Sequence, residues 1–382
     1  MSAGRKWPSE LTEHKDPVSG ARVRQFTSSL GNSNHFYFTY PCWYDNGRKL
    51  MIASDRENRT NFYGVDLAGG ELTQLTDIDP ANGPLDAQSM SMNPCRAEAY
   101  FLQGTTTYAL DLQTLATRPL FTAPGGYEAE TSSATADGKY LITGYARDLS
   151  QQFDVDLRNG YVGFEEIWAA HPHCAIVRVA LDTGKSELVF EENNWIGHLN
   201  TSTTLPHIMT FCHEGPWHKV DNRIWGLDLN TGKTWKIRPT GSGEKVGHEY
   251  WMLDGEHIGY HGVTSVGPIF GSIRYDNSEM FEAPFAFNSW HFHGYGIDQV
   301  VGDGDAQNPY LLLWRLKDGR FEGPKALVWH RGSFHTQRAH VHPCFSADGK
   351  QIVYTADPQG YGQVSIVDIP DWDALPDRST RP

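Results

Sequence analysis

Two short histidine motifs carry the residue types from which metal sites are built. The first is HTQRAHVHP, which contains Gln337, His340 and His342. Residues two apart share a face of an extended segment, so the two histidines can point at one ion while the glutamine adds an amide oxygen. The second is WHFHG, which offers His291 or, as the alternative, His293. Imidazole nitrogens with an amide oxygen suit a divalent ion such as Mn, Fe, Co, Ni or Zn.

Other polar motifs are candidates for acid–base chemistry or substrate binding. His248 lies in VGHEYW, where spacing alone favours a packed or capping histidine. A turn network is the alternative for His213 and Glu214 in FCHEGP, and a salt bridge to a nearby aspartate is the alternative for Arg223 in VDNRIW. GDGDAQ at Gly302 is interpreted as a turn, because it lacks the spacing of a calcium loop. The remaining candidates are His198, His213, Glu214, Arg223 and Arg338.

A weak internal repeat predicts the elements that position these motifs. Its unit is an Asp-Gly or Asn-Gly turn, an apolar strand, a strand ending in Asp-Leu, a turn with glycine and a closing strand. Seven copies fit the chain, the clearest starting at Tyr44, and their spacing matches propeller blades of about 40–50 residues. Both HxH motifs precede a copy, and blades stacked around an axis bring such positions together. This raises the odds that the motifs share one site.

The predicted fold is all-β: a seven-bladed β-propeller formed by residues 1–382 as a single domain. The strand-like segment Ala21–Thr27 should pair with the last blade and close the ring. An insertion at about 149–174 interrupts the third copy and should shape one face, with FEEIWAAH as a short helix. A large β-sandwich would not explain the repeated turn pattern.

Composition narrows the class of partner and the compartment. The formal net charge is −14, which argues against nucleic acid or an anionic membrane as the main partner. A small anionic substrate remains compatible, because a local cluster of arginine, histidine and metal can reverse the sign in one pocket. The N-terminus has no apolar segment typical of a secretory signal, and no apolar run approaches membrane-spanning length. Five scattered cysteines favour free thiols in a reducing cytoplasm.

Taken together, these motifs resemble the oligogalacturonate lyases, cytoplasmic pectin-degrading enzymes of the polysaccharide-lyase class. The resemblance runs from SGARVRQFT to the last repeat, and its specific motifs are NNWIGH, FCHEGP, VDNRIW, GHEYW, VGDGD and QxxHxH followed by PxFSxDGK. It implies a seven-bladed propeller, a histidine base and a manganese-type ion bound by three histidines and a glutamine. By motif, the ligands would be His291, Gln337, His340 and His342, the base His248, and Arg223 a residue of the substrate site.

The implied reaction removes the C5 proton of a uronate and expels the oxygen on C4. A metal bound to the carboxylate would neutralise it, and a neutral imidazole of ordinary pKa about 6.5 could accept the proton. His248 and Arg223 are the candidate catalytic residues: Arg223 would bind a carboxylate or hydroxyl by bidentate hydrogen bonding and could share the role of base, as arginine or lysine does in some lyases. A guanidinium hardly deprotonates, so His248 is the preferred base. Three alternatives remain: a lyase for another uronate linkage, such as a glucuronide or rhamnose-containing oligosaccharide, a non-catalytic scaffold, and a metal-dependent hydrolase. The sequence leaves the oligomeric state open.

Overall fold

The computed structural model describes residues 2–285 and 289–378, which form seven antiparallel sheets in chain order. Each sheet is built around four strands, and we number these blades I to VII. The fold is a seven-bladed β-propeller, as predicted. The chain divides into two compact units. Unit 1 contains the described residues of 1–78, 267–270 and 282–382, and unit 2 contains 79–266 and 271–281.

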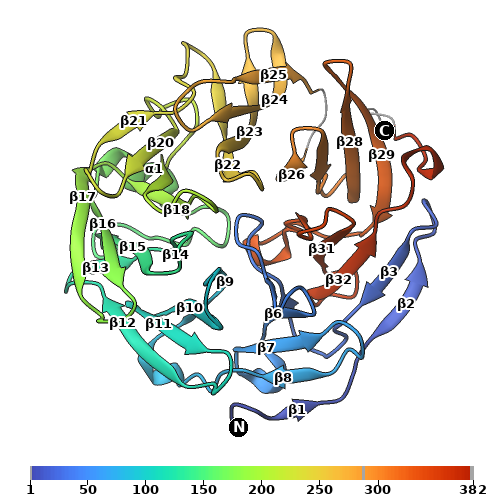
Figure 1. Ribbon diagram of the computed structural model, residues 1–382, viewed down its shortest axis with the longest axis horizontal. Coiled ribbons are helices and arrows are strands. Elements are labelled where there is room, and N and C mark those ends of the chain that lie inside the picture. The colour runs from blue at the N-terminus through green and yellow to red at the C-terminus, as the bar shows by residue number, and fades with distance from the viewer. Residues whose placement is uncertain (1, 286–288, 379–382) are drawn as a thin grey trace. The chain divides into compact units, whose positions relative to one another are not determined.

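Unit 1 contains blades I, VI and VII, whose strands Figure 1 labels. Blade I has the order β1-β8-β7-β6-β4, with β5 paired to β6, from β1 (Lys6–Trp7), β4 (Ser33–Asn34), β5 (Trp43–Tyr44), β6 (Lys49–Ser54), β7 (Asn61–Asp66) and β8 (Leu72–Gln74). Blade VI contains β26 (Phe292–Gly296), β27 (Gln299–Gly302), β28 (Tyr310–Lys317) and β29 (Arg320–Trp329). Blade VII has the order β2-β3-β32-β31-β30, from β2 (Thr12–Lys15), β3 (Arg22–Gln25), β30 (Cys344–Phe345), β31 (Gln351–Ala356) and β32 (Gln363–Asp368). The short 3-10 helices of this unit are η1 (Arg56–Asn58), η3 (Gln337–Ala339) and η4 (Trp372–Ala374).

Unit 2 contains blades II, III and IV and the first two strands of blade V. Blade II follows η2 (Pro80–Asn82) and contains β9 (Leu85–Met92), β10 (Glu98–Gln103), β11 (Thr106–Asp111) and β12 (Thr117–Thr122). Blade III contains β13 (Tyr127–Ala129), β14 (Ser133–Ala134), β15 (Tyr140–Arg147), β16 (His173–Ala180) and β17 (Ser186–Asn193). Blade IV contains β18 (Ile196–Thr201), β19 (Ile208–His213), β20 (Ile224–Asp228) and β21 (Thr234–Lys236). Blade V contains β22 (Lys245–Trp251), β23 (His257–Thr264), β24 (Gly267–Arg274) and β25 (Phe281–Pro284).

The repeated Asp-Leu pairs form the hairpin turns of the blades. Asp66, Asp111 and Asp228 each end a strand, and each Oδ1 accepts two backbone N–H groups of the following turn at 2.8–3.1 Å. An aspartate that satisfies the backbone of its own turn favours a tight reversal over continued strand. The residue pattern that identified the repeat is therefore the one that ends its strands.

Apolar faces of successive blades pack together within each unit. In unit 2, Tyr100 of blade II joins a buried cluster with Leu141 and Val177 of blade III. A second cluster joins Ile176 of blade III to Phe211 of blade IV. A single blade cannot bury both faces, so this stacking supplies the core.

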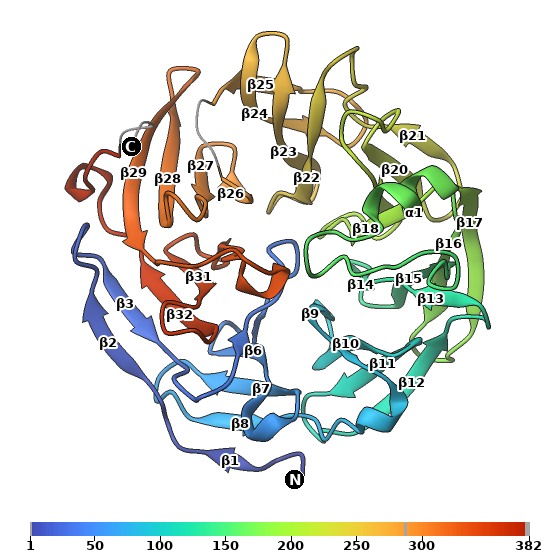
Figure 2. The same cartoon turned by 180° about the vertical axis from the view of Figure 1, so that it is seen from behind.

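The predicted insertion separates β15 from β16 and contains a helix, as expected. This is α1 (Phe164–Ala170), which Figure 2 shows in front of β18 and β20. Phe164 packs edge-on against Trp195 with ring centroids 5.3 Å apart, and Glu165 pairs with Lys219 at 2.7 Å. The insertion therefore covers blade IV.

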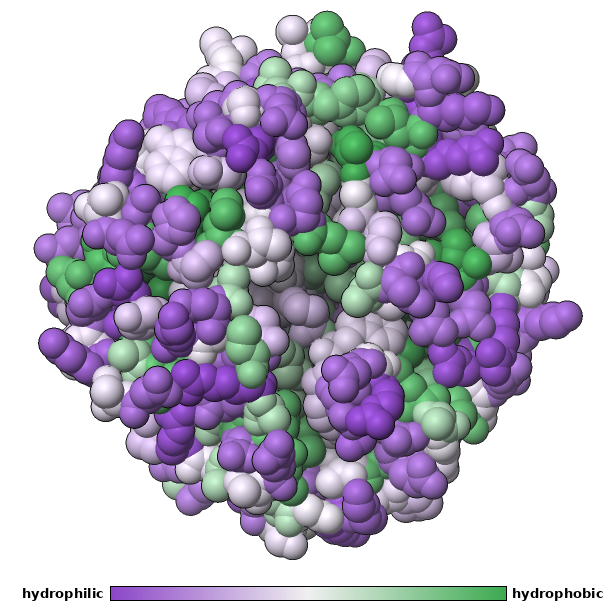
Figure 3. All heavy atoms as spheres, in the orientation of Figure 1, coloured by the Kyte–Doolittle hydropathy of each residue, from purple (hydrophilic) through white to green (hydrophobic). Residues whose placement is uncertain are grey.

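No helix among the described residues is both long and apolar enough to cross a bilayer. Figure 3 shows many hydrophilic side chains on the face that it draws, with apolar ones between them.

The N-terminal strand completes the last blade, as predicted. β3 pairs with β32 through Val23 and Val367, and both side chains lie in a buried cluster with Leu313 and Leu327 of blade VI. Two further strands were not predicted: β2 pairs with β3, and β1 pairs with β8 of blade I.

Truncation of Val23 tests this closure. Val23 is fully buried, so Val23→Ala should lower the free energy of unfolding by about 1–3 kcal/mol through lost burial and a residual cavity. The measurement is the midpoint of urea unfolding. Lys15→Ala, on exposed β2, is the matched control and should leave the midpoint nearly unchanged. Equal midpoints for the two variants would contradict the role of this strand in the core.

Candidate functional site

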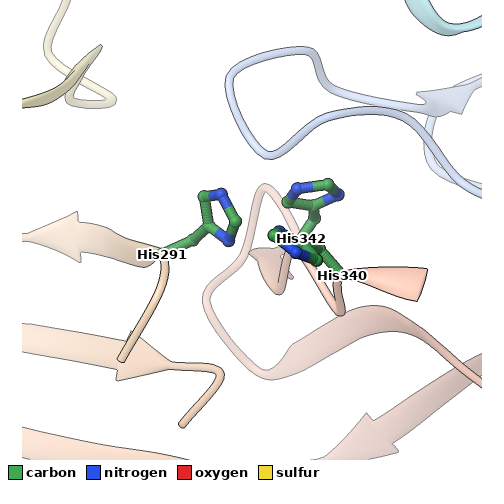
Figure 4. Close-up of side chains that lie close together, drawn as sticks. All are labelled: His291, His340 and His342. Atoms are coloured by element: carbon green, nitrogen blue, oxygen red, sulfur yellow. The ribbon is translucent and has the colours of Figure 1, made fainter. Parts of the chain in front are cut away.

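Three histidines from the two HxH motifs converge in unit 1 (Figure 4). His291 directly precedes β26, while His340 and His342 lie between η3 and β30. One ring nitrogen from each lies within 4.8 Å of the other two. The ring centroids of His291 and His342 are 4.3 Å apart. The backbone at His342 has a φ of 48°, so the segment is not uniformly extended as the spacing argument assumed.

All three imidazoles are buried, and two of them are neutral. His291, His340 and His342 are at most 4% exposed. Burial, with the neighbouring His291, lowers the pKa of His340 to about 4, and burial with the other histidines holds the pKa of His342 well below its usual range. A neutral imidazole keeps the lone pair that a metal ligand requires.

The cluster fits a divalent cation. Among the described residues, His340 Nδ1 and His342 Nε2 are buried nitrogens without a hydrogen-bond partner. Leaving such an atom unsatisfied costs about 1–3 kcal/mol, so two in one cluster indicate a missing partner. Three converging nitrogens without a cysteine ligand match a borderline ion more closely than a structural zinc site.

Aromatic and histidine side chains of unit 1 surround the cluster. Tyr37 contacts His342 with ring centroids 4.8 Å apart, and Phe38 contacts His291 at 5.4 Å. His35 Nε2 donates to the backbone carbonyl of His342 at 2.7 Å, which holds the left-handed residue in place. Trp290, 44% exposed, has its ring 5.2 Å from that of His340.

The other residues of the two motifs lie as follows. The ring of His293 contacts β30 instead: its Nδ1 accepts from Phe345 N at 3.4 Å, so of the two alternatives His291 joins the cluster. Gln337 begins η3 and is partly buried, three residues before His340. Arg338, the next residue, has an exposed side chain.

His248 lies in unit 2 at an irregularity of blade V. The register of β22 and β23 shifts between Gly247 and Tyr250, and His248 there has a φ of 50°. Its Nδ1 lies 2.9 Å from His261 Nε2 on β23, so the two imidazoles share a hydrogen bond. Trp217 contacts both rings edge-on, at 5.0 and 5.6 Å between centroids.

The same irregularity recurs in blade IV. The register of β18 and β19 shifts between Gly197 and Asn200, and His198 has a φ of 52°. Strands β18 and β22 thus each contain a β-bulge at the histidine of a Gly-His pair. Such bulges reorient a side chain relative to the ladder. His198 Nε2 lies 3.4 Å from Glu214 Oε2.

Arg223 is the centre of a buried ion-pair network. It is 2% exposed and donates to both oxygens of Glu214, at 2.6 and 3.2 Å, and from Nε to Glu249 at 3.5 Å. Burial alone would lower the pKa of Arg223, but the neighbouring Cys212, Glu214 and Glu249 raise it, so the group stays cationic. Burial alone would likewise raise the pKa of Glu214, but Arg223 and His198 hold it well below its usual range. The salt bridge considered from the sequence is present, with glutamates as partners.

His213 bridges two carboxylates. Its Nδ1 lies 2.9 Å from Asp221 Oδ1, and its Nε2 lies 2.9 Å from Glu192 Oε1. Burial opposes protonation, but these two hydrogen bonds prevail and raise the pKa of His213. Both ring nitrogens are therefore engaged within the protein, as in the turn network considered from the sequence.

Glu130 of unit 2 is a partly buried carboxyl group close to this network. Burial raises its pKa to about 8, and repulsion from Glu128 and Glu214 adds to the effect. It was not identified from the sequence, because no motif surrounds it.

Sequence reasoning also missed two partners of the candidate residues. His261 was not identified because it faces His248 only through the pairing of β22 with β23. Asp303 lies within the GDGDAQ segment interpreted as a turn, and Asp305 does form that turn, whereas Asp303 binds His291. The signal for Asp303 was its place in the VGDGD motif.

A family model described as oligogalacturonate lyase matches residues 1–269. An oligogalacturonide lyase of Pectobacterium atrosepticum is 25% identical, over 97% of this chain and 99% of the relative. An oligogalacturonate lyase of Dickeya dadantii is 24% identical with the same coverage.

Solved structures show the same similarity. An oligogalacturonate lyase in complex with manganese is 26% identical, with a TM-score of 0.86 over 97% of this chain and 99% of that one. An oligogalacturonate lyase from Vibrio parahaemolyticus, 22% identical, shares the fold with a TM-score of 0.86 over 97% and 99% of the two chains.

The raised pKa of Glu130 predicts a pH-dependent stability. Between its ordinary value of 4.5 and about 8, the folded protein holds a proton that the unfolded chain has lost, so stability falls as pH rises through this window. Glu130→Gln mimics the protonated form, so it should exceed the wild type in stability at pH 9 by about 1–3 kcal/mol, allowing for partial exposure.

The measurement is thermal unfolding of both proteins from pH 5 to pH 9. The difference should nearly vanish at pH 5, where the wild-type group is protonated in the folded state. Glu166→Gln, on the exposed face of α1, is the control and should show no such pH-dependent gain. A Glu130→Gln curve parallel to that of the wild type would contradict the prediction.

Proposed function

Because this chain belongs to the oligogalacturonate lyase family, we propose that it cleaves short oligogalacturonates by metal-dependent β-elimination. The observation that supports this most is the cluster of three buried histidines, two of which have a ring nitrogen with no hydrogen-bond partner among the described residues. A manganese-containing relative that covers nearly the whole chain supports manganese as the ion. A scaffold would have no need for such a cluster.

The proposed metal ligands are His291, His340 and His342, with the amide oxygen of Gln337 as the fourth. A bound divalent ion would neutralise the uronate carboxylate and stabilise the charge that develops when the C5 proton leaves. The protein's part is to hold three imidazoles out of water, which keeps His340 and His342 neutral so that their lone pairs remain available.

The proposed base is His248, which would accept the C5 proton. Its Nδ1 faces His261, so Nε2 is the nitrogen assigned to the substrate. If His248 Nδ1–H donates a hydrogen bond to His261 Nε2, the lone pair that accepts the C5 proton is on His248 Nε2, and the hydrogen bond then stabilises the imidazolium. The oxygen on C4 leaves with the bonding electrons and takes a proton from solvent.

Several residues are proposed to bind or arrange the substrate site. Arg223 stays cationic and hydrogen-bonded to glutamates, so we assign it to positioning Glu214 and not to proton abstraction. Exposed Arg338 would attract a uronate carboxylate, and Trp290 offers a half-exposed ring for sugar stacking. The other substrate-binding residues predicted from the sequence are His198, His213 and Glu214. Both ring nitrogens of His213 are hydrogen-bonded to carboxylates, so we propose that it acts by positioning Glu192 and Asp221.

We further propose that the enzyme acts in the cytoplasm on short products of pectin degradation. The five cysteines are all free thiols, which suits a reducing compartment. The substrate is then a small anionic oligosaccharide, and local cations offset the net charge of −14.

The proposed activity predicts a new ultraviolet absorbance. Elimination creates a C4–C5 double bond conjugated to the carboxylate, so absorbance should rise when protein and manganese are incubated with di- or trigalacturonate. A chelator should abolish the rise, and so should His340→Ala, whereas the matched variant His335→Ala, at an exposed position of the same segment, should retain it. A rise only with glucuronate-containing oligosaccharides would assign another linkage, and no rise with either would contradict the proposal.

The proposed base predicts a separable defect. His248→Ala should lower turnover by about 10²–10⁴-fold, because a positioned general base contributes on that order. Manganese binding should be unchanged, because His248 is not in the three-histidine cluster. His257→Ala, on β23 and paired with Asp254, is the control. Wild-type turnover in His248→Ala would require another base.

A further inference from the structure

Asp303 directs both carboxylate oxygens at a single residue of the histidine cluster. It follows β27, is fully buried, and is brought beside His291 by the pairing of Phe292 with Gly302. Its Oδ1 accepts from the backbone N–H of His291 at 2.8 Å, and its Oδ2 lies 2.9 Å from His291 Nδ1. An ionised carboxylate only accepts, so Nδ1 carries the hydrogen. The lone pair of His291 is therefore on Nε2.

A second buried histidine, His330, hydrogen-bonds to the backbone of Asp303. His330 directly follows β29, and its Nε2 donates to the backbone carbonyl of Asp303 at 3.0 Å. Its Nδ1 accepts from Gly332 N–H at 2.9 Å, and burial lowers its pKa to about 4, so it is neutral with a single N–H. The hydrogen bonds thus run in one direction, from Gly332 through His330 to Asp303.

His330 also begins the segment that leads to the other two histidines. Its ring contacts Phe334 at 5.8 Å between centroids, and Phe334 contacts His340 at 5.6 Å. His330 therefore contacts both Asp303, which hydrogen-bonds to His291, and Phe334, which packs against His340. This connects blade VI to the segment before β30 inside unit 1.

We propose that Asp303 and His330 are positioning residues for the metal. Asp303 holds His291 in the tautomer whose Nε2 can bind the ion, and His330 fixes Asp303 relative to the segment that carries His340 and His342. The inference rests on the proposed function, because it requires that the cluster binds a metal. Outer hydrogen-bond partners of this kind orient ligands, and their loss typically costs about 10–100-fold in metal affinity.

Asp303→Asn is the sharpest test. An amide has one acceptor atom and one NH₂ donor group. It therefore cannot accept hydrogen bonds on two separate atoms, as Asp303 does from the backbone N–H and the Nδ1–H of His291. Either the backbone bond is lost, or the amide donates to Nδ1 and moves the ring proton to Nε2, the atom needed by the metal. Manganese affinity should fall by about 10–100-fold, measured by the paramagnetic resonance signal of free Mn²⁺ during titration into purified protein.

Asp16→Asn is the matched control. Asp16 is a 3% exposed carboxylate of the same unit that accepts the backbone N–H groups of Val18, Ser19 and Trp329 and no histidine. Its affinity for manganese should equal that of the wild type. Should Asp303→Asn fail to fold, His330→Phe tests the same network and should lose affinity, while His330→Gln keeps a side-chain donor for the Asp303 carbonyl and should recover part of it.

The outcomes separate this inference from the proposed function. The metal site is supported if the wild type binds manganese and His340→Ala does not. The positioning role is then supported if Asp303→Asn and His330→Phe lose manganese affinity while Asp16→Asn keeps it. Wild-type affinity in Asp303→Asn or in His330→Phe would overturn the positioning role while the metal site stands. A wild-type protein that binds no manganese would overturn both.

Discussion

Exclusion of water from three imidazoles is the constraint on which the candidate site depends. His340 Nδ1 and His342 Nε2 are buried without partners among the described residues, and the rings remain neutral because burial opposes protonation. Such an arrangement costs free energy in the absence of a ligand, so the surrounding structure must hold it. Tyr37 and Phe38 pack against the rings, and His35 holds the strained backbone of His342. Stacked blades supply the rigid support that flexible loops would not.

In unit 2, by contrast, the buried polar groups are charged and are stabilised by partners of opposite charge. Arg223 is compensated by Glu214 and Glu249, and His213 by Glu192 and Asp221. Buried charges persist when their partners are well placed, and removal of one partner then leaves the other uncompensated. The motifs FCHEGP and VDNRIW therefore have a structural role: Glu214 lies beside His198, and Arg223 pairs with Glu249, which follows His248 in the bulge of β22.

Local patterns in the sequence predicted the features that depend on local structure. The repeated turn pattern predicted seven blades, and in three of them the aspartate of an Asp-Leu pair closes its own hairpin. The predicted unit had three strands, so the first strand of each blade lay outside it; β4 and β30 have only two residues, too few to show alternation, whereas β18 and β22 contain Gly-His bulges that interrupt it. His340 and His342 are close in sequence, and the family motif already favoured His291 over His293; the structure brings His291 to the other two. Asp303 and His261 act through cross-strand contacts, and the partners of Arg223 come from separate strands, which no spacing rule reveals.

The pairing of β3 with β32 has a consequence for synthesis on the ribosome. Gln25 and Ser365 are partners although about 340 residues separate them. At about 5–20 residues per second, roughly 20–70 s pass between the emergence of the two strands. During that interval the edge of β3 and the side chain of Val23 have no partner strand, and such edges promote aggregation. The nascent chain therefore has an obligatory waiting period in which β2 can pair with one edge of β3 while the edge that later receives β32 stays open.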